Sequence, residues 1–559
     1  MKKAWFCSIT LGLCLSMLSP TGFAAPEKRR ISVDEYKDKM KAGWIGQMVG
    51  VGWGGPTEFR WQGEIIPEDQ MPAWEPTLVN QFGQDDIYVE MTFMRSLELC
   101  GLDVDIRQAG IDFANSEYAL WHANRYGREN LRKGIAPPDS SHPQFNAHAD
   151  DIDYQIEADF SGLIAPGMPN VAIQLGEVFG RLMNYGDGLY GGQFVGGMYA
   201  EAFFETDIQK IVEAGLKCIP AQSQYAECIR DVIQWYKEEP KDWQKSWAKI
   251  EEKYQDNPDY RKFSCSGTEP FNIDAKINGA YIVMGLLYGE GDIDQTILIS
   301  TRCGQDSDCN PSNAAGILCT TLGFSNLPDR FTSALDESKH FSHTAYNFDL
   351  LIKVSEKLVR DAVLKFGGEI ETDTDGKEWY IIPVQEPQPS EFVQCWEPGP
   401  IANSRFTPEE MEKIAAGKAK DLTEAMQTFA PGWACKDCGE DMDPGMKDEA
   451  LGKQTVLLTH PLDEEKPCIL TKKVEIPEDN KTTLHLTVGH HPEGDWQLIV
   501  KADGEALFNE SIGGEEAWRD VAVDLSAFAG KTITLDLLNQ PTGWRFEGGY
   551  WARIELRSE

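Results

Sequence analysis

Two short segments of this sequence each carry a pair of aspartates in a setting that favours chemistry. Asp85 and Asp86 lie in FGQDDIYVEMTF, and Asp306 and Asp308 lie in GQDSDCNPSNAAG. Each pair stands at the entrance of a segment that predicts a helix. If the fold brought the four carboxylates together, they would repel one another unless cations lay between them. Because hard oxygen ligands suit Mg²⁺, Mn²⁺ or Ca²⁺, the pairs predict a divalent-cation centre.

Helix capping is the alternative interpretation of these aspartates. Aspartate is a favoured N-cap residue, and its negative charge suits the positive end of the helix dipole. For either pair alone, capping is the simpler explanation. Two similar pairs, each preceded by glycine and surrounded by small or polar residues, favour a shared site.

A third segment, GQMVGVGWGGPTEF, combines helical glycines with an acidic residue. Gly46, Gly50 and Gly54 are four residues apart, so they fall on one helix face and allow a second helix to approach closely. Pro56 then ends the helix and presents Glu58. Glu58 is either a solvated loop residue or a carboxylate that faces a pocket.

These three segments, in this order, resemble the ADP-ribosylglycohydrolase family over about residues 32 to 366. The resemblance implies a compact all-α domain with a binuclear Mg²⁺ or Mn²⁺ centre. It also implies roles for individual residues. Asp85, Asp86, Asp306 and Asp308 would be metal ligands, and Glu58 and Asp306 would be the catalytic groups near the scissile bond.

The sequence departs from the family pattern at several positions around the aspartates. Gln84 and Cys309 stand where the family usually has ligating threonines, Ile87 replaces a further threonine, and Val51 replaces a frequent aspartate. A glutamine oxygen suits a hard cation, whereas a thiol is a soft ligand that is poorly matched to magnesium. We therefore expect one or two Mg²⁺ or Mn²⁺ ions, with Gln84 and Cys309 as further candidate ligands.

The middle of the chain supplies candidate substrate-binding residues. In HADDIDYQIEADFSGLIAPGMPN, the resemblance places Asp153, Glu157 and Asp159 toward the substrate, and Asp187 follows in the glycine-rich NYGDGLYGGQFVGG. Those glycines favour close helix packing over a phosphate cradle. The GxxxxGKS pattern is absent from the sequence, which excludes a P-loop nucleotide hydrolase.

Hydrophobic periodicity divides the chain into domains. Ser32 to Glu35 form a capping-box pattern, and helical patterning continues to about residue 366. We therefore predict an all-α domain at residues 32–370 and an irregular connector with a short helix at 371–445. Alternating segments predict a β-sandwich of jelly-roll, galactose-binding-like type at 446–559.

The N-terminal residues and the composition indicate where this protein works. Residues 1–24 have a basic start, an apolar run and small residues, the layout of a cleavable signal peptide. A secreted or periplasmic protein is expected, without a membrane span. The formal net charge of −38 disfavours nucleic acid as a partner, and a small molecule or glycan is the expected substrate.

Two features of the C-terminal half allow alternative interpretations. Cys435 and Cys438 form a CxxC that an oxidising compartment could close into a disulfide, and a zinc site is less favoured because no second CxxC follows. Trp496, Trp544 and Trp551 either stack on sugars or, as is commoner in a sandwich, pack in its core.

Together these features predict a secreted, metal-dependent glycoside hydrolase. It would cleave a ribosyl or other furanosyl bond by attack of a metal-oriented water at the anomeric carbon. One alternative is a non-catalytic sugar- or ADP-ribose-binding protein with a degenerate metal site. Another is a structural acidic protein whose aspartates only cap helices.

Overall fold

The computed structural model describes residues 27–414, 422–439, 441–463, 465–478, 481–543 and 546–558. The predicted signal peptide, residues 1–24, lies outside this range. Among the described residues, no helix combines the length and apolar character needed to cross a bilayer.

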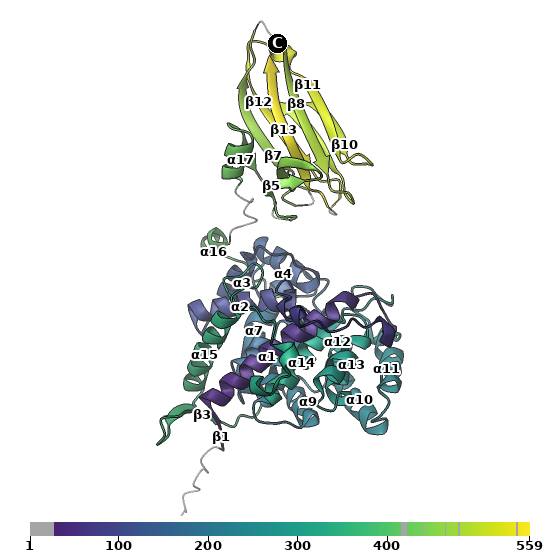
Figure 1. Cartoon of the computed structure of the whole chain (residues 1–559), viewed down its shortest axis with the longest axis vertical. Helices are drawn as coiled ribbons and strands as arrows, with labels where there is room; N and C mark the ends of the chain where they lie inside the picture. Colours follow the sequence, from purple (N-terminus) through teal and green to yellow (C-terminus); the bar gives the residue numbers. More distant parts are fainter. Residues whose placement is uncertain are drawn as a thin grey trace, which may run out of the picture.

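The N-terminal part is the predicted all-α domain (Figure 1). Its helices are α1 (Val33–Gly54), α2 (Asp85–Cys100), α3 (Ile106–Ala114), α4 (His122–Arg132), α5 (Asp153–Ile156), α6 (Asp159–Leu163), α7 (Pro169–Phe179), α8 (Asp187–Ala202), α9 (Ile208–Leu216), α10 (Gln224–Glu238), α11 (Trp243–Ile250), α12 (Ala275–Tyr288), α13 (Ile293–Arg302), α14 (Cys309–Leu322) and α15 (Phe348–Lys365). Ser32 caps α1 by accepting a hydrogen bond from the Glu35 N–H, as the capping-box pattern predicts.

Helices α1 and α14 pack together through the glycines of α1 (Figure 1). A Cβ on Gly46 would lie 2.4 Å from the Ala315 carbonyl oxygen, and one on Gly50 would lie 2.3 Å from that of Pro311. At Gly54 it would lie 2.2 Å from the Ser307 carbonyl oxygen. The predicted close helix approach is therefore present, and it brings the end of α1 against the segment that carries Asp306 and Asp308.

The helical domain also contains a small antiparallel sheet in the order β1 (Lys28–Ser32), β3 (Glu378–Pro383), β2 (Glu369–Thr372). The connector after β3 contacts the domain closely. Asp139, for example, accepts hydrogen bonds from the N–H groups of Ala402 and Ser404. The expected connector at 371–445 thus contains strands that complete the helical domain, followed by the short helix α16 (Pro408–Lys413).

The C-terminal part is a sandwich of two five-stranded antiparallel sheets. One sheet has the order β10-β9-β12-β7-β4 and the other β11-β8-β13-β6-β5. The strands are β4 (Ala434–Lys436), β5 (Gly445–Ala450), β6 (Lys453–Thr459), β7 (Cys468–Glu475), β8 (Thr482–His490), β9 (Trp496–Ala502), β10 (Glu505–Ile512), β11 (Trp518–Asp524), β12 (Thr532–Gln540) and β13 (Gly549–Ser558).

The sandwich core extends upstream of the expected boundary at residue 446. Leu422 and Met426, at helix α17 (Thr423–Phe429), and Trp433 are buried in it, because an apolar helix face covers what would otherwise be exposed sheet. Trp496 and Trp551 are fully buried and their rings lie 5.3 Å apart, so both serve the core. Trp544 lies outside the described residues.

A third cysteine joins the CxxC pair in the sandwich. The sulfur atoms of Cys435 and Cys468 are 3.5 Å apart, and Cys438 completes a cluster of three free thiols. Cys468 is the first residue of strand β7, 33 residues after Cys435, so the spacing of the CxxC could not reveal it. A Cys435–Cys438 disulfide is absent from the described residues.

Candidate metal centre

The two aspartate pairs meet where α2 begins and where the chain enters α14. Ligand atoms of Asp85, Asp86 and Cys309 all lie within 4.8 Å of one another. Asp306 and Asp308 form a second such group with Cys309. Cys309 therefore connects the pairs, and the fold brings together carboxylates that are distant in the sequence.

Cys309 acts in this cluster as a hydrogen-bond donor. Its thiol donates to Asp86 Oδ2 over 3.0 Å and lies 3.8 Å from Asp308 Oδ1. Burial, followed by the charges of Asp306 and Asp308, raises the pKa of the Cys309 thiol, so the group keeps its proton. In this arrangement Cys309 supports the Asp86 carboxylate, and its role as a metal ligand remains a prediction.

Burial raises the pKa of each of the four aspartates, and the charges of neighbouring carboxylates raise the pKa values of Asp85, Asp86 and Asp306 further. Burial and then the charge of Asp308 raise the pKa of Asp85 to about 6. The pKa values of Asp86, Asp306 and Asp308 are also raised, first by burial. Without a cation, some of these carboxyls must hold protons near neutral pH.

The donor set fits a hard divalent cation. Asp86 and Asp306 are almost fully buried, and the Oδ1 atom of each lacks a hydrogen-bond partner among the described residues. Helix capping does not account for this arrangement, because the N-cap of α2 is Gln84, and Asp308, the N-cap of α14, makes no capping hydrogen bond with its side chain. Carboxylate oxygens facing one another with free lone pairs are the donors that Mg²⁺ and Mn²⁺ prefer. The aspartates that would hold the ion are Asp85, Asp86, Asp306 and Asp308.

Glu58 lies on a loop that is fixed to the aspartate segment. Thr57 Oγ1 is 2.8 Å from Ser307 Oγ, and the Phe59 N–H donates to the Gln305 carbonyl. Burial of part of the side chain, followed by the charges of Asp308 and Asp85, raises the pKa of Glu58 to about 8, while the residue keeps an exposed part. Glu58 therefore lies close enough to the acidic cluster to be affected by its charges, and its catalytic role remains a prediction.

Gln84 stands beside the same loop. It is the residue before α2, its side chain makes no capping hydrogen bond, and its Nε2 lies 3.3 Å from where a Cβ on Gly55 would be. Its amide therefore reaches the end of α1 next to the cluster, and its role as a ligand remains a prediction.

Asp153 and Glu157 are buried and engaged with helix α4. Asp153 accepts hydrogen bonds from the N–H groups of Ala123 and Asn124 at the start of that helix. Glu157 accepts one from the Asn124 side-chain amide. These contacts give both residues a positioning role, and direct substrate contact remains a prediction.

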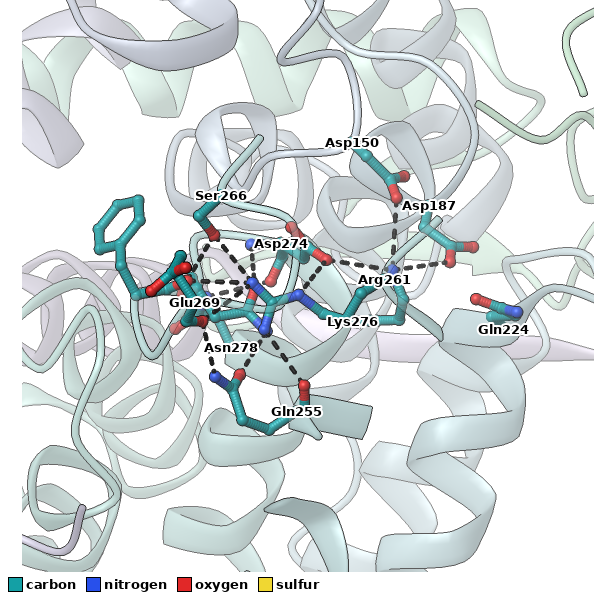
Figure 2. A network of polar contacts seen from close by, with 12 residues as sticks. Asp150, Asp187, Gln224, Gln255, Arg261, Ser266, Glu269, Asp274, Lys276 and Asn278 are labelled. Atoms are coloured by element: carbon teal, nitrogen blue, oxygen red, sulfur yellow. Dashed lines mark hydrogen bonds and ion pairs between the residues drawn. The ribbon is translucent and has the colours of Figure 1, made fainter. Parts of the chain in front are cut away.

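Asp159 and Asp187 are buried in different networks. Asp159 accepts a hydrogen bond of 2.7 Å from Asn313 Nδ2 of α14. Asp187 lies 3.9 Å from Lys276 Nζ, which also contacts Asp150 at 3.3 Å and Asp274 at 3.6 Å (Figure 2). A buried ammonium surrounded by carboxylates holds these segments together, and substrate binding by Asp159 or Asp187 remains a prediction.

Sequence reasoning missed an aromatic layer beside Glu58. Phe59 packs edge-on against Phe271 at 5.2 Å, and the His122 ring stacks on Phe271 at 5.9 Å. The charge of His122 lowers the pKa values of Glu58 and Asp85, which places this imidazole near the acidic cluster. Phe59, His122 and Phe271 come from three separate segments, so no sequence spacing could have revealed that they pack together.

Comparison with known proteins identifies the family. The solved structure of an "ADP-ribosylglycohydrolase-related protein complex" matches with 14% identity and a TM-score of 0.39, over 59% of this chain and 99% of that one. The CBM22-1 xylan-binding domain of Paenibacillus barcinonensis Xyn10C matches with 12% identity and a TM-score of 0.18, over 23% and 87%. CBM35 from the same organism matches with 16% identity and a TM-score of 0.17, over 23% and 94%. The search of curated proteins gave no match. The ADP-ribosylglycohydrolase family model matches residues 32–364, more than half of the sequence, and the chain therefore belongs to the ADP-ribosylglycohydrolase family.

Proposed function

We propose that this protein is an exported, metal-dependent glycoside hydrolase that cleaves a ribosyl or other furanosyl bond. The observation that carries the proposal is the cluster of Asp85, Asp86, Asp306 and Asp308, which has unpaired buried oxygens and Glu58 beside it. Family membership supports hydrolysis of a glycosyl bond. The predicted signal peptide supports export and therefore a glycan or small-molecule substrate.

The proposed chemistry assigns each group a task. The four aspartates hold one or two Mg²⁺ or Mn²⁺ ions. When bound, the cation supplies positive charge that orients sugar hydroxyls and favours loss of a proton from water. Glu58 accepts a proton from the water whose oxygen forms a bond to the anomeric carbon, and Asp306 is the alternative acceptor. The bond from the anomeric carbon to the leaving group breaks, and the leaving group takes up a proton, from the protonated acceptor or from solvent. The charges of Asp308 and Asp85 help to raise the pKa of Glu58 to about 8 in the metal-free protein, so a cation held by these aspartates would lower it and favour the carboxylate form that accepts a proton.

Hydrolysis of aryl furanosides and ADP-ribose conjugates, with and without added Mg²⁺ or Mn²⁺, tests the proposal. Turnover should require the ion and should be lost in Asp306→Asn. Asp105→Asn is the matched control, since Asp105 is an exposed aspartate that caps α3 by accepting the Arg107 N–H. Ion-dependent sugar binding without turnover would support the binding-protein alternative. Equal effects of the two variants would support the capping alternative.

A further inference from the structure

A second group of potential metal ligands lies outside the acidic centre. His122, His148, Asp151 and Cys265 each offer one ligand atom, and the four atoms all lie within 4.8 Å of one another. They come from the start of α4, from the segment before α5 and from the loop before α12. The tertiary structure therefore gathers two imidazoles, a carboxylate and a thiol from three separate segments.

Asp151 lies at the middle of this group. Its side chain is fully buried, and its Oδ2 atom lies 2.6 Å from His148 Nδ1 and 3.2 Å from His122 Nδ1. The thiol of Cys265 also interacts with Asp151. The other oxygen of this carboxylate, Asp151 Oδ1, is buried and has no hydrogen-bond partner among the described residues, and the only polar contact of His122 Nδ1 among them is the one to Asp151. Such unpaired buried atoms are costly unless something binds them.

We infer that these four residues bind a borderline-soft divalent cation, with Zn²⁺ as the best match. Imidazole nitrogen, thiolate sulfur and a carboxylate oxygen form a donor set typical of zinc, and they differ from the all-oxygen set of the acidic centre. A tetrahedral Zn²⁺ site separates its ligand atoms by about 3.4 Å, so the observed cluster needs only small side-chain shifts. Four protein ligands make a closed, structural site.

Binding balances protons and charge. The Cys265 thiol releases its proton to solvent and binds as thiolate, and each imidazole binds while neutral. With the Asp151 carboxylate, the two anionic ligands compensate the dipositive ion. The existing contacts between the histidines and Asp151 are replaced by bonds to the metal.

The site would fix the loop that carries Phe271. One end of this loop is already anchored: Arg261 donates hydrogen bonds to the Phe271 carbonyl and to Ser266 Oγ, and it lies 3.8 Å from Asp274 (Figure 2). Cys265 is exposed and directly precedes Ser266. A metal bond to Cys265 would therefore add a second anchor to this loop and hold it against His122.

Zn²⁺ titration of the full chain tests the inference, with excess Mg²⁺ present to occupy the acidic centre. Isothermal titration should find a site whose affinity falls by about 100-fold or more in Cys265→Ser and in His148→Ala, since loss of even an outer-shell partner costs 10- to 100-fold. Cys100→Ser is the control for an exposed thiol of the same domain. Cys435→Ser disrupts the three-thiol cluster of the sandwich by removing one of its members, so it reports any Zn²⁺ binding at that cluster.

Two further measurements distinguish a metal site from a hydrogen-bonded histidine pair. In a Cys435→Ser background, which disrupts the thiol cluster of the sandwich, Co²⁺ should give a thiolate-to-metal absorption band that Cys265→Ser abolishes and that Cys100→Ser retains. Zn²⁺ should slow amide hydrogen exchange in residues 262–270 of the wild-type chain. Unchanged Zn²⁺ affinity in both ligand variants, or a cobalt spectrum that is insensitive to Cys265→Ser, would overturn the inference. These readouts do not depend on hydrolase activity.

Discussion

The Cys309 thiol donates a hydrogen bond to the Asp86 carboxylate, although 223 residues separate them in the chain. This contact joins the two aspartate pairs, because Cys309 directly follows Asp308 and Asp86 directly follows Asp85. The thiol thereby takes one lone pair of Asp86 and leaves Oδ1 available to a cation. Cys309 is poorly suited to bind magnesium, but it stabilises the acidic cluster as a hydrogen-bond donor to Asp86.

Cys309→Thr should preserve or tighten Mg²⁺ binding, because a hydroxyl keeps the donor and adds a hard oxygen. Cys309→Val is the matched control, since valine has the shape of threonine without the hydroxyl. We expect weaker Mg²⁺ binding in the valine variant, which leaves Asp86 Oδ2 without its donor. Isothermal titration measures both variants. Loss of Mg²⁺ binding in Cys309→Thr would show that the sulfur itself is needed.

The thermal stabilisation by Mg²⁺ should increase with pH. In the metal-free protein, the raised pKa values of Asp85, Asp86 and Asp306 mean that the folded state binds protons more tightly than the unfolded state. Their contribution to stability is present below the unfolded pKa of about 4 and is lost as pH rises through the folded values, about 6 for Asp85.

Mg²⁺ binds the deprotonated carboxylates, so it restores stability where the protons have left. Melting temperatures measured with and without Mg²⁺ from about pH 5 to about pH 8 should diverge as pH rises. Asp306→Asn should show a smaller divergence. A rise in melting temperature on adding Mg²⁺ that is the same at every pH would contradict this account of the centre.

Glu58→Gln should lower turnover by about 10² or more while Mg²⁺ binding and the melting temperature change little, because the amide cannot accept the proton. The rate should also lose the part of its pH dependence that reflects deprotonation of Glu58, which is the rise in rate with pH. Glu64→Gln is the control, since Glu64 is an exposed carboxylate of the same loop region. Wild-type turnover in Glu58→Gln would remove this residue from the mechanism.

Gly50→Ala should destabilise the helical domain by about 1–3 kcal/mol, the usual cost of overpacking. The added methyl would lie 2.3 Å from the Pro311 carbonyl oxygen, so α14 would have to move away from α1. Mg²⁺ affinity should fall as well, because Asp308 directly precedes α14. Gly55→Ala should have a milder effect, since its methyl meets only the end of the Gln84 side chain at 3.3 Å. Chemical denaturation compares the two.

Residues 27–414 and 422–559 should each fold when produced separately, because their apolar residues form separate buried clusters. The first fragment should keep the Mg²⁺-dependent melting shift of the whole chain. Circular dichroism and thermal melts provide the measurement. An insoluble helical fragment would show that the sandwich completes its core.

The sequence alone determined the helical domain, the sandwich and the aspartates of the centre. Hydrophobic periodicity and the Ser32 capping pattern are local properties, so they predict α1 and the change to strands without knowledge of the fold. The glycines of α1 and the paired aspartates also stand in short contiguous motifs. Residues close in sequence share one element, and their spacing alone fixes which face they occupy.

Only the tertiary structure decided which distant side chains meet. Neither the Cys309–Asp86 contact nor the group of His122, His148, Asp151 and Cys265 leaves a local pattern, because each joins segments that only the packing of helices brings together. The extended sandwich core has the same origin, since the apolar face of α17 is buried by the sheets it covers. Side-chain contacts across long sequence separations depend on the whole packed core, and no short segment encodes them.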